Sequence, residues 1–168
     1  ANMKKYLLSL AISFSLLATS AYAVDMSEVE NLEPYFEKTG LDISAYNKVL
    51  VAPLGVGATF IVPPPWVTGA DASAKKWSLT ADDERWLRES YQKAVRAEIS
   101  QEFEVVDQPG EGVLIVRIEL VSLMPFARKG ENVQTQGFGV VVAQVQLRDG
   151  NNGELLAVYE GPQRVGRE

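Results

Sequence analysis

One segment, residues 80–102, predicts a long amphipathic helix and thereby limits the folds open to this chain. Thr80 is a suitable N-cap, and the three acidic residues at 82–84 favour the positive end of a helix dipole. Apolar residues then recur at spacings of three and four along one face: Leu87, Tyr91, Ala94, Val95 and Ile99. A helix with a single apolar face has to bury that face against a second layer.

The remaining apolar patterns predict β-strands, which supply that second layer. Residues 47–53 carry a continuous apolar run, as in a strand covered on both faces, whereas residues 112–123 alternate between apolar and polar side chains. A further short strand over residues 58–62 is an option. The other expected strands cover residues 103–106, 138–149 and 155–161.

This order, one strand, the helix and then four strands, predicts an α/β (α+β) fold in a single domain. We expect a mixed sheet of about five strands, with one main helix packed on one face. If the strands on either side of the helix are parallel, their crossover should be right-handed, and the later strands should form an antiparallel meander. The other face would carry Arg117, Glu119, Gln144, Gln146 and Arg148, so it is expected to be wet or lightly covered.

The N-terminus has the layout of a bacterial secretory signal peptide, residues 1–23. Lys4 and Lys5 precede a largely apolar stretch, and the small residues Ala21 and Ala23 follow it. We expect cleavage after Ala23 and a periplasmic protein without a transmembrane span, because no later apolar run is long enough to cross a bilayer. N-terminal sequencing of the mature protein should begin at Val24, and retained Met3 in a membrane-bound species would contradict this.

The mature chain divides into an N-terminal arm, residues 24–46, and the α/β domain, residues 47–168. The arm has apolar residues Val29, Leu32 and Phe36 at helical spacing, interrupted by Pro34. It is expected to form either a short helix or an ordered arm.

Two absences and the net charge narrow the possible functions. The sequence contains no cysteine and no histidine, which removes disulfides, thiol and Ser-His catalysis, the usual zinc ligand sets and lipidation on cysteine. The formal charge of −6 opposes binding to nucleic acid. We therefore expect no catalytic residues, no metal and no cofactor.

Three motifs resemble functional sites but have simpler interpretations. The Gly55-Val-Gly57 segment lacks the third glycine of a dinucleotide site and reads as a bend or bulge. The acidic residues 82–84 read as the start of a helix rather than as an acid–base pair. Asp149, Asn151 and Glu160 fit part of a calcium loop, but the glycine is misplaced, and a hairpin turn with Gly153 at positive φ is favoured.

The loop that begins "IVPPPWVTG" provides the candidate binding residues, which are Pro64, Pro65, Trp66 and Trp77. Consecutive prolines stiffen a loop, and an exposed tryptophan beside them would be a low-entropy anchor for a partner. Alternatively, Trp66 folds back as a lid over the sheet or the end of the helix, since large aromatic side chains are highly buried on average.

Three stretches, Leu79–Asp83, Glu104–Arg117 and Asp149–Leu156, resemble a family of bacterial envelope proteins catalogued as domain of unknown function 3313. The resemblance covers roughly residues 40–160 and is distributed rather than centred on a catalytic signature. It implies an exported, often lipidated protein without an assigned activity. Because this chain has no cysteine, we do not expect a lipid tether here.

These observations favour an exported, non-catalytic envelope protein that serves as a binding or assembly module, with another envelope protein as its partner. The alternative is a small-ligand-binding protein that uses the loop of Trp66 and Trp77 against the sheet edge. An enzyme with carboxylate chemistry is the third and least favoured interpretation.

Overall fold

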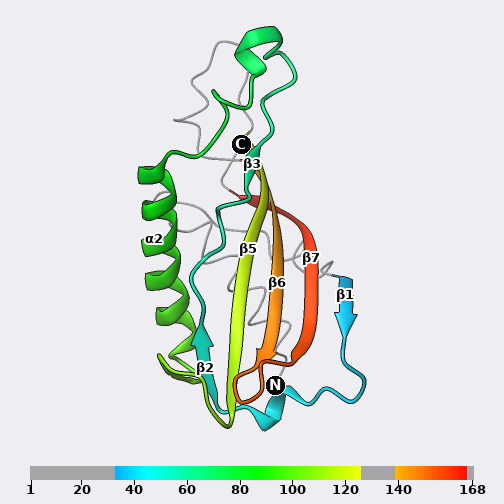
Figure 1. The fold of residues 1–168 in the computed structure, drawn as a ribbon, viewed down its shortest axis with the longest axis vertical. Helices are drawn as coiled ribbons and strands as arrows, with labels where there is room; N and C mark the ends of the chain where they lie inside the picture. The colour runs from blue at the N-terminus through cyan, green and yellow to red at the C-terminus, as the bar shows by residue number, and fades with distance from the viewer. Residues whose placement is uncertain (1–32, 126–138, 166–168) are drawn as a thin grey trace.

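One helix covers one face of a mixed β-sheet in the computed structural model, which describes residues 33–125 and 139–165 (Figure 1). The strands are β1 (Glu33–Glu37), β2 (Lys48–Val51), β3 (Phe60–Ile61), β4 (Glu104–Val105), β5 (Val113–Pro125), β6 (Gly139–Asp149) and β7 (Leu155–Val165). The helices are α2 (Ala81–Ile99) and two short 3-10 turns, η2 (Ile43–Ala45) and η3 (Gly69–Ala72). The predicted signal peptide and most of the polar loop expected at 125–136 lie outside the described residues.

Helix α2 forms within the predicted segment and begins with a capping box. The Thr80 hydroxyl accepts a hydrogen bond from the Asp83 backbone N–H at 3.1 Å, and the Asp83 carboxylate accepts one from the Thr80 N–H at 3.0 Å. The acidic residues 82–84 thus serve the helix start, as expected. Tyr91, Val95 and Ile99 are buried against the sheet, whereas Leu87 on the same face is half-buried.

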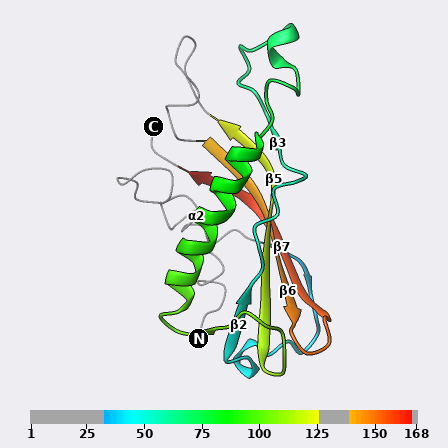
Figure 2. The same cartoon turned by 60° about the vertical axis from the view of Figure 1, so that its left-hand side comes forward.

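The strand order in space is β1–β7–β6–β5–β2–β4, and β3 lies on the same side of β5 as β2. Strand β2 is parallel to both β4 and β5, while β5, β6 and β7 form the expected antiparallel meander. Helix α2 runs obliquely across one face of this sheet (Figure 2). The predicted α+β fold is confirmed, although the sheet has seven strands rather than about five. No helix in the described part of the chain has the length and apolarity to cross a membrane.

The chain from Lys48 to Val62 behaves as one interrupted strand alongside β5. After β2, the Gly55 N–H donates to the Ile118 carbonyl at 2.9 Å and the Gly55 carbonyl accepts from the Leu120 N–H at 2.8 Å, before β3 resumes the parallel pairing. Leu54 and Val56, on either side of this contact, are each only 1% exposed. The Gly55-Val-Gly57 motif is therefore a break in a strand that sends two side chains into the core, in line with the predicted bend or bulge.

A β-bulge in β5 keeps its apolar side chains on the helix-facing side. Leu120 lies opposite Ala143 and Ser122 lies opposite Val142, so Val121 is an extra residue on β5. The bulge reverses the alternation, which places the odd-numbered Leu123 on the same face as the even-numbered Leu120. Strand β5 consequently continues past the end of the alternation that its sequence shows.

The N-terminal arm contributes an edge strand to the same sheet. Residues 33–37 pair antiparallel with β7 as β1, with a register shift between Pro34 and Phe36. Of the two expectations for this segment, the ordered arm is found for residues 33–46 and the helix around Phe36 is wrong. Pro34 explains the error, because proline disfavours a helix interior and is tolerated on an edge strand.

Candidate functional site

The segment between β3 and α2 extends beyond the end of the sheet and of the helix in both views (Figures 1 and 2). Within it, the Val67 N–H donates to the Pro64 carbonyl at 2.9 Å and closes a tight turn with Pro65 and Trp66 at its centre. Proline suits the second position of such a turn because its φ is already fixed. Pro64 is buried, Pro65 is exposed and Trp66 keeps 39% of its surface exposed.

The second half of this segment is held together by its own polar contacts. The Trp77 indole N–H donates to the Asp71 carbonyl oxygen at 2.7 Å, and the Lys76 ammonium pairs with the Asp71 carboxylate. The backbone N–H groups of Lys76 and Trp77 both donate to the Ser73 carbonyl. The hydrogen bond from Lys76 holds the pKa of Asp71 below its usual value.

The four candidate binding residues thus fall into two groups. Pro65 and Trp66 lie at the exposed centre of the turn, whereas Pro64 is buried at its start and Trp77 is half-buried and hydrogen-bonded. Pro64 and Trp77 contribute to the shape of the loop, and Pro65 and Trp66 are its exposed part.

The sheet face opposite α2, called the open face below, carries four polar side chains at the centre of β5 and β6. Arg117 forms an ion pair with Glu119 at 2.7 Å, and the Gln146 amide donates to the Gln144 amide oxygen at 2.8 Å. Arg117 lies opposite Gln146, and Glu119 lies opposite Gln144. Four of the five side chains expected on this face are therefore there, and the ion pair runs along one strand.

Glu119 also explains why residue 55 is a glycine. A Cβ atom placed on Gly55 would lie 2.6 Å from Glu119 Cγ, which is closer than real Cβ contacts. The bare backbone of Gly55 lets the Glu119 side chain lie over the neighbouring strand and reach Arg117. The four polar groups of the open face satisfy one another in two pairs, an arrangement typical of a solvated sheet surface.

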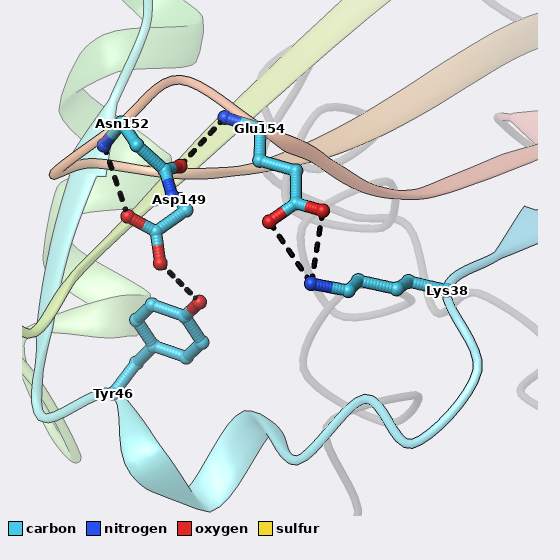
Figure 3. Close-up of polar contacts among 5 residues, drawn as sticks. All are labelled: Lys38, Tyr46, Asp149, Asn152 and Glu154. Carbon is cyan, nitrogen blue, oxygen red and sulfur yellow. Dashed lines mark hydrogen bonds and ion pairs between the residues drawn. The ribbon is translucent and has the colours of Figure 1, made fainter.

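A second polar cluster lies at the turn between β6 and β7 (Figure 3). The Tyr46 hydroxyl donates to Asp149 Oδ2 at 2.7 Å, while Asp149 Oδ1 accepts from the backbone N–H groups of Asn151 and Asn152. Lys38 pairs with Glu154 at 2.9 Å. Gly153 has φ +75°, so the predicted hairpin turn is confirmed, and the Asp149 carboxylate closes that turn.

This cluster fastens the N-terminal arm to the β6–β7 hairpin. Sequence reasoning identified the turn but not Lys38 or Tyr46, which lie 116 and 103 residues from their partners. No local pattern could have identified them, because a single tyrosine or lysine in an arm has no periodicity. Within the described residues, no group of three or more histidine, cysteine or acidic side chains is arranged to hold a metal ion.

Replacing Tyr46 by phenylalanine is expected to lower stability most near neutral pH. The hydrogen bond from Tyr46 is the main cause that holds the pKa of Asp149 below its usual value. A lowered carboxyl pKa stabilises the fold above about pH 4, and this stabilisation is lost as the pH falls through the folded-state value. The difference between wild type and variant in urea melts should therefore shrink in acid.

The stability difference between wild type and Tyr46→Phe should also shrink at alkaline pH. Burial, followed by the contact with Asp149, raises the pKa of Tyr46 to about 12. A raised phenol pKa stabilises the fold below about pH 10, and that contribution disappears as the pH rises toward the folded value. Tyr35→Phe is the control, since Tyr35 is 82% exposed. A difference between wild type and Tyr46→Phe that does not change with pH would contradict the assignment.

Together these features define an α+β protein in which one helix covers one face of a mixed sheet and a stiffened loop projects from one end. The chain belongs to the family described as protein of unknown function (DUF3313), whose model matches residues 26–165. The family resemblance drawn from the sequence is thereby confirmed. Neither the curated proteins nor the solved structures include a match to this protein.

Proposed function

We propose that this protein is an exported, non-catalytic envelope protein that acts as a binding or assembly module through the turn Pro64–Val67. The observation that carries the proposal is the exposure of Pro65 and Trp66 on a loop whose shape is already fixed. The N-terminal pattern of Lys4, Lys5 and Ala21–Ala23 supports export to the periplasm.

A fixed loop favours binding because less conformational entropy is lost when a partner docks. The turn closed by Pro64 and Val67 and the contacts of Asp71 with Lys76 and Trp77 hold the loop before any partner arrives. Tryptophan is also among the residues most enriched at the energetic centres of protein interfaces. A protein partner in the envelope therefore suits this loop best.

The non-catalytic part of the proposal is supported by side-chain chemistry. The sequence offers neither histidine nor cysteine as a base or nucleophile. The carboxylates at Asp83, Glu119 and Asp149 are engaged in a helix cap, an ion pair and a turn. Each has a structural partner that accounts for its position.

The test is to purify the tagged protein from envelope extract, identify any stoichiometric protein partner, and measure its affinity for wild type and two variants. Trp66→Ala should weaken the affinity by roughly 2 kcal/mol or more, about thirtyfold, as truncation of an interface anchor does. The matched control is Trp86→Ala, which removes another exposed tryptophan (51%) from helix α2 and should bind as the wild type does.

Two results would count against the proposal. Equal affinities of the Trp66→Ala and Trp86→Ala variants would remove the turn from the interface. A small molecule retained on the purified protein, seen by native mass spectrometry and lost in Trp66→Ala, would instead favour the small-ligand alternative.

A further inference from the structure

Asn152 and Gly153 form the one Asn-Gly pair in the sequence, and both residues are exposed in the turn between β6 and β7. In such a pair the backbone nitrogen of glycine can attack the asparagine side chain, since glycine has no Cβ to hinder the approach. We propose that Asn152 is a site of spontaneous deamidation through a succinimide, and that the contacts holding the turn set its rate.

The turn activates the Asn152 side chain for this attack. The Glu154 backbone N–H donates to Asn152 Oδ1 at 2.9 Å (Figure 3). Negative charge develops on that oxygen when a nucleophile adds to the adjacent carbon, and a fixed N–H donor at this position stabilises it, as in an oxyanion hole. Space around the nucleophile is also open, because a Cβ atom placed on Gly153 would meet nothing within 4 Å.

The same turn restrains the nucleophile. The Gly153 N–H donates to the Asp149 carbonyl at 2.8 Å, so it has to leave this acceptor and lose its proton before it can attack. The Asp149 side chain is fixed in turn by the Tyr46 hydroxyl and by the N–H groups of Asn151 and Asn152. Tyr46 therefore acts as a positioning residue that keeps the turn closed and the reaction slow.

The reaction needs water as its only co-reactant and involves no oxidation. Gly153 N loses its proton and bonds to Asn152 Cγ, and the bond between Cγ and the amide nitrogen Nδ2 breaks to release ammonia. Water then opens the succinimide at either carbonyl and leaves aspartate or isoaspartate. Both products place a new carboxylate between Asp149 and Glu154, and isoaspartate adds a carbon to the backbone of the turn, so modification should loosen the attachment of the arm.

Two neighbouring residues lack this combination of features, and the first of them, Asn151, serves as the internal control. Asn151 is also exposed, but the residue after it is Asn152, whose Cβ hinders the attack. Asp149 also precedes a glycine, yet the Gly150 N–H donates to the Val113 carbonyl at 2.8 Å and Gly150 is buried. The hydrogen bond from Tyr46 further lowers the pKa of Asp149, and an ionised carboxylate resists attack by a nucleophile.

The experiment ages the full-length protein at mildly alkaline pH and follows Asn151 and Asn152 by peptide mapping with mass spectrometry. Wild type, Tyr46→Phe and the control Tyr35→Phe are compared under conditions in which circular dichroism shows all three to be folded, with urea-unfolded wild type as the unrestrained reference. The mass change that replaces NH2 by OH should occur at Asn152 and not at Asn151. Its rate should be several-fold higher in Tyr46→Phe than in wild type or Tyr35→Phe.

Equal modification of Asn151 and Asn152, or an unmodified Asn152 even in the unfolded protein, would overturn the site. Identical rates of Asn152 deamidation in wild type and Tyr46→Phe would overturn the proposal that the contacts of the turn control this rate. If the folded wild type reacted faster than the unfolded protein, activation by Glu154 would exceed the restraint on Gly153. This result would overturn the proposal that the closed turn slows deamidation.

Discussion

Replacing Leu114 by alanine is expected to lower the free energy of unfolding by about 2 to 5 kcal/mol. Leu114 has no exposed surface and lies on β5 beside Val49 of β2, within the core that α2 covers. The smaller side chain loses buried apolar area and leaves a cavity that close-packed neighbours fill only in part. Urea melts followed by circular dichroism measure the loss.

Leu87→Ala is the matched control for this prediction. The helical pattern alone predicts that Leu87 is a core residue with the same large cost, but its side chain is only half-buried at the edge of the core. Its loss should be nearer to about 1 kcal/mol, the centre of the range for single substitutions. Equal losses at the two positions would contradict the assignment of Leu114 to the centre of the core and of Leu87 to its edge.

Gly150→Ala is expected to cost about 1 to 3 kcal/mol, the range for overpacking a filled site. A Cβ atom on Gly150 would lie 2.7 Å from the Val113 carbonyl oxygen and 2.8 Å from Val113 Cβ. Both atoms are fixed, because the Gly150 N–H bonds to that same carbonyl and Val113 is buried at the start of β5. The turn and β5 would have to move apart.

Gly57→Ala provides the comparison for Gly150→Ala. Gly57 is exposed, does not have a positive φ, and a Cβ there would meet nothing within 4 Å. Alanine at such a position leaves the fold unstrained and restricts the unfolded state, so stability should stay level or rise by about 0.4 to 1 kcal/mol. A Gly150→Ala variant as stable as Gly57→Ala would disprove the close approach of the turn to β5.

Periodic segments were predicted correctly from the sequence because burial on one face leaves a repeating pattern. The three-to-four spacing through Tyr91 and Val95 gave the helix, and the alternation along residues 112–123 and 138–149 gave the central strands. Strand β1 was missed because it is held chiefly by backbone pairing and its exposed residues carry no alternation. Strand β5 extends to Pro125, two residues beyond the predicted end at 123, and the bulge at Val121, which reverses the alternation, was not predicted.

In the candidate sites, too, features with a local sequence signal were predicted and features that depend on tertiary contacts were not. The proline-rich segment was predicted as a stiffened loop because its local chemistry, consecutive prolines before Trp66, defines it, but the tight turn that it forms was not predicted. The different roles of Trp66 and Trp77 depend on a contact with Asp71 that the sequence does not encode in any regular spacing. The contact of Tyr46 with Asp149 joins an arm to a distant hairpin, so it depends on the completed sheet.

The parallel pairing of β2 with β5 also has a consequence for the order in which the protein folds. Strands β6 and β7 are joined by a tight turn, and a hairpin of this kind closes within microseconds. Strand β2 reaches β5 only after the loop and helix α2 between them have been brought back to the sheet, which carries a larger loop-closure entropy. We therefore expect the meander to form first and the docking of β2, with Leu54 and Val56, to limit the folding rate.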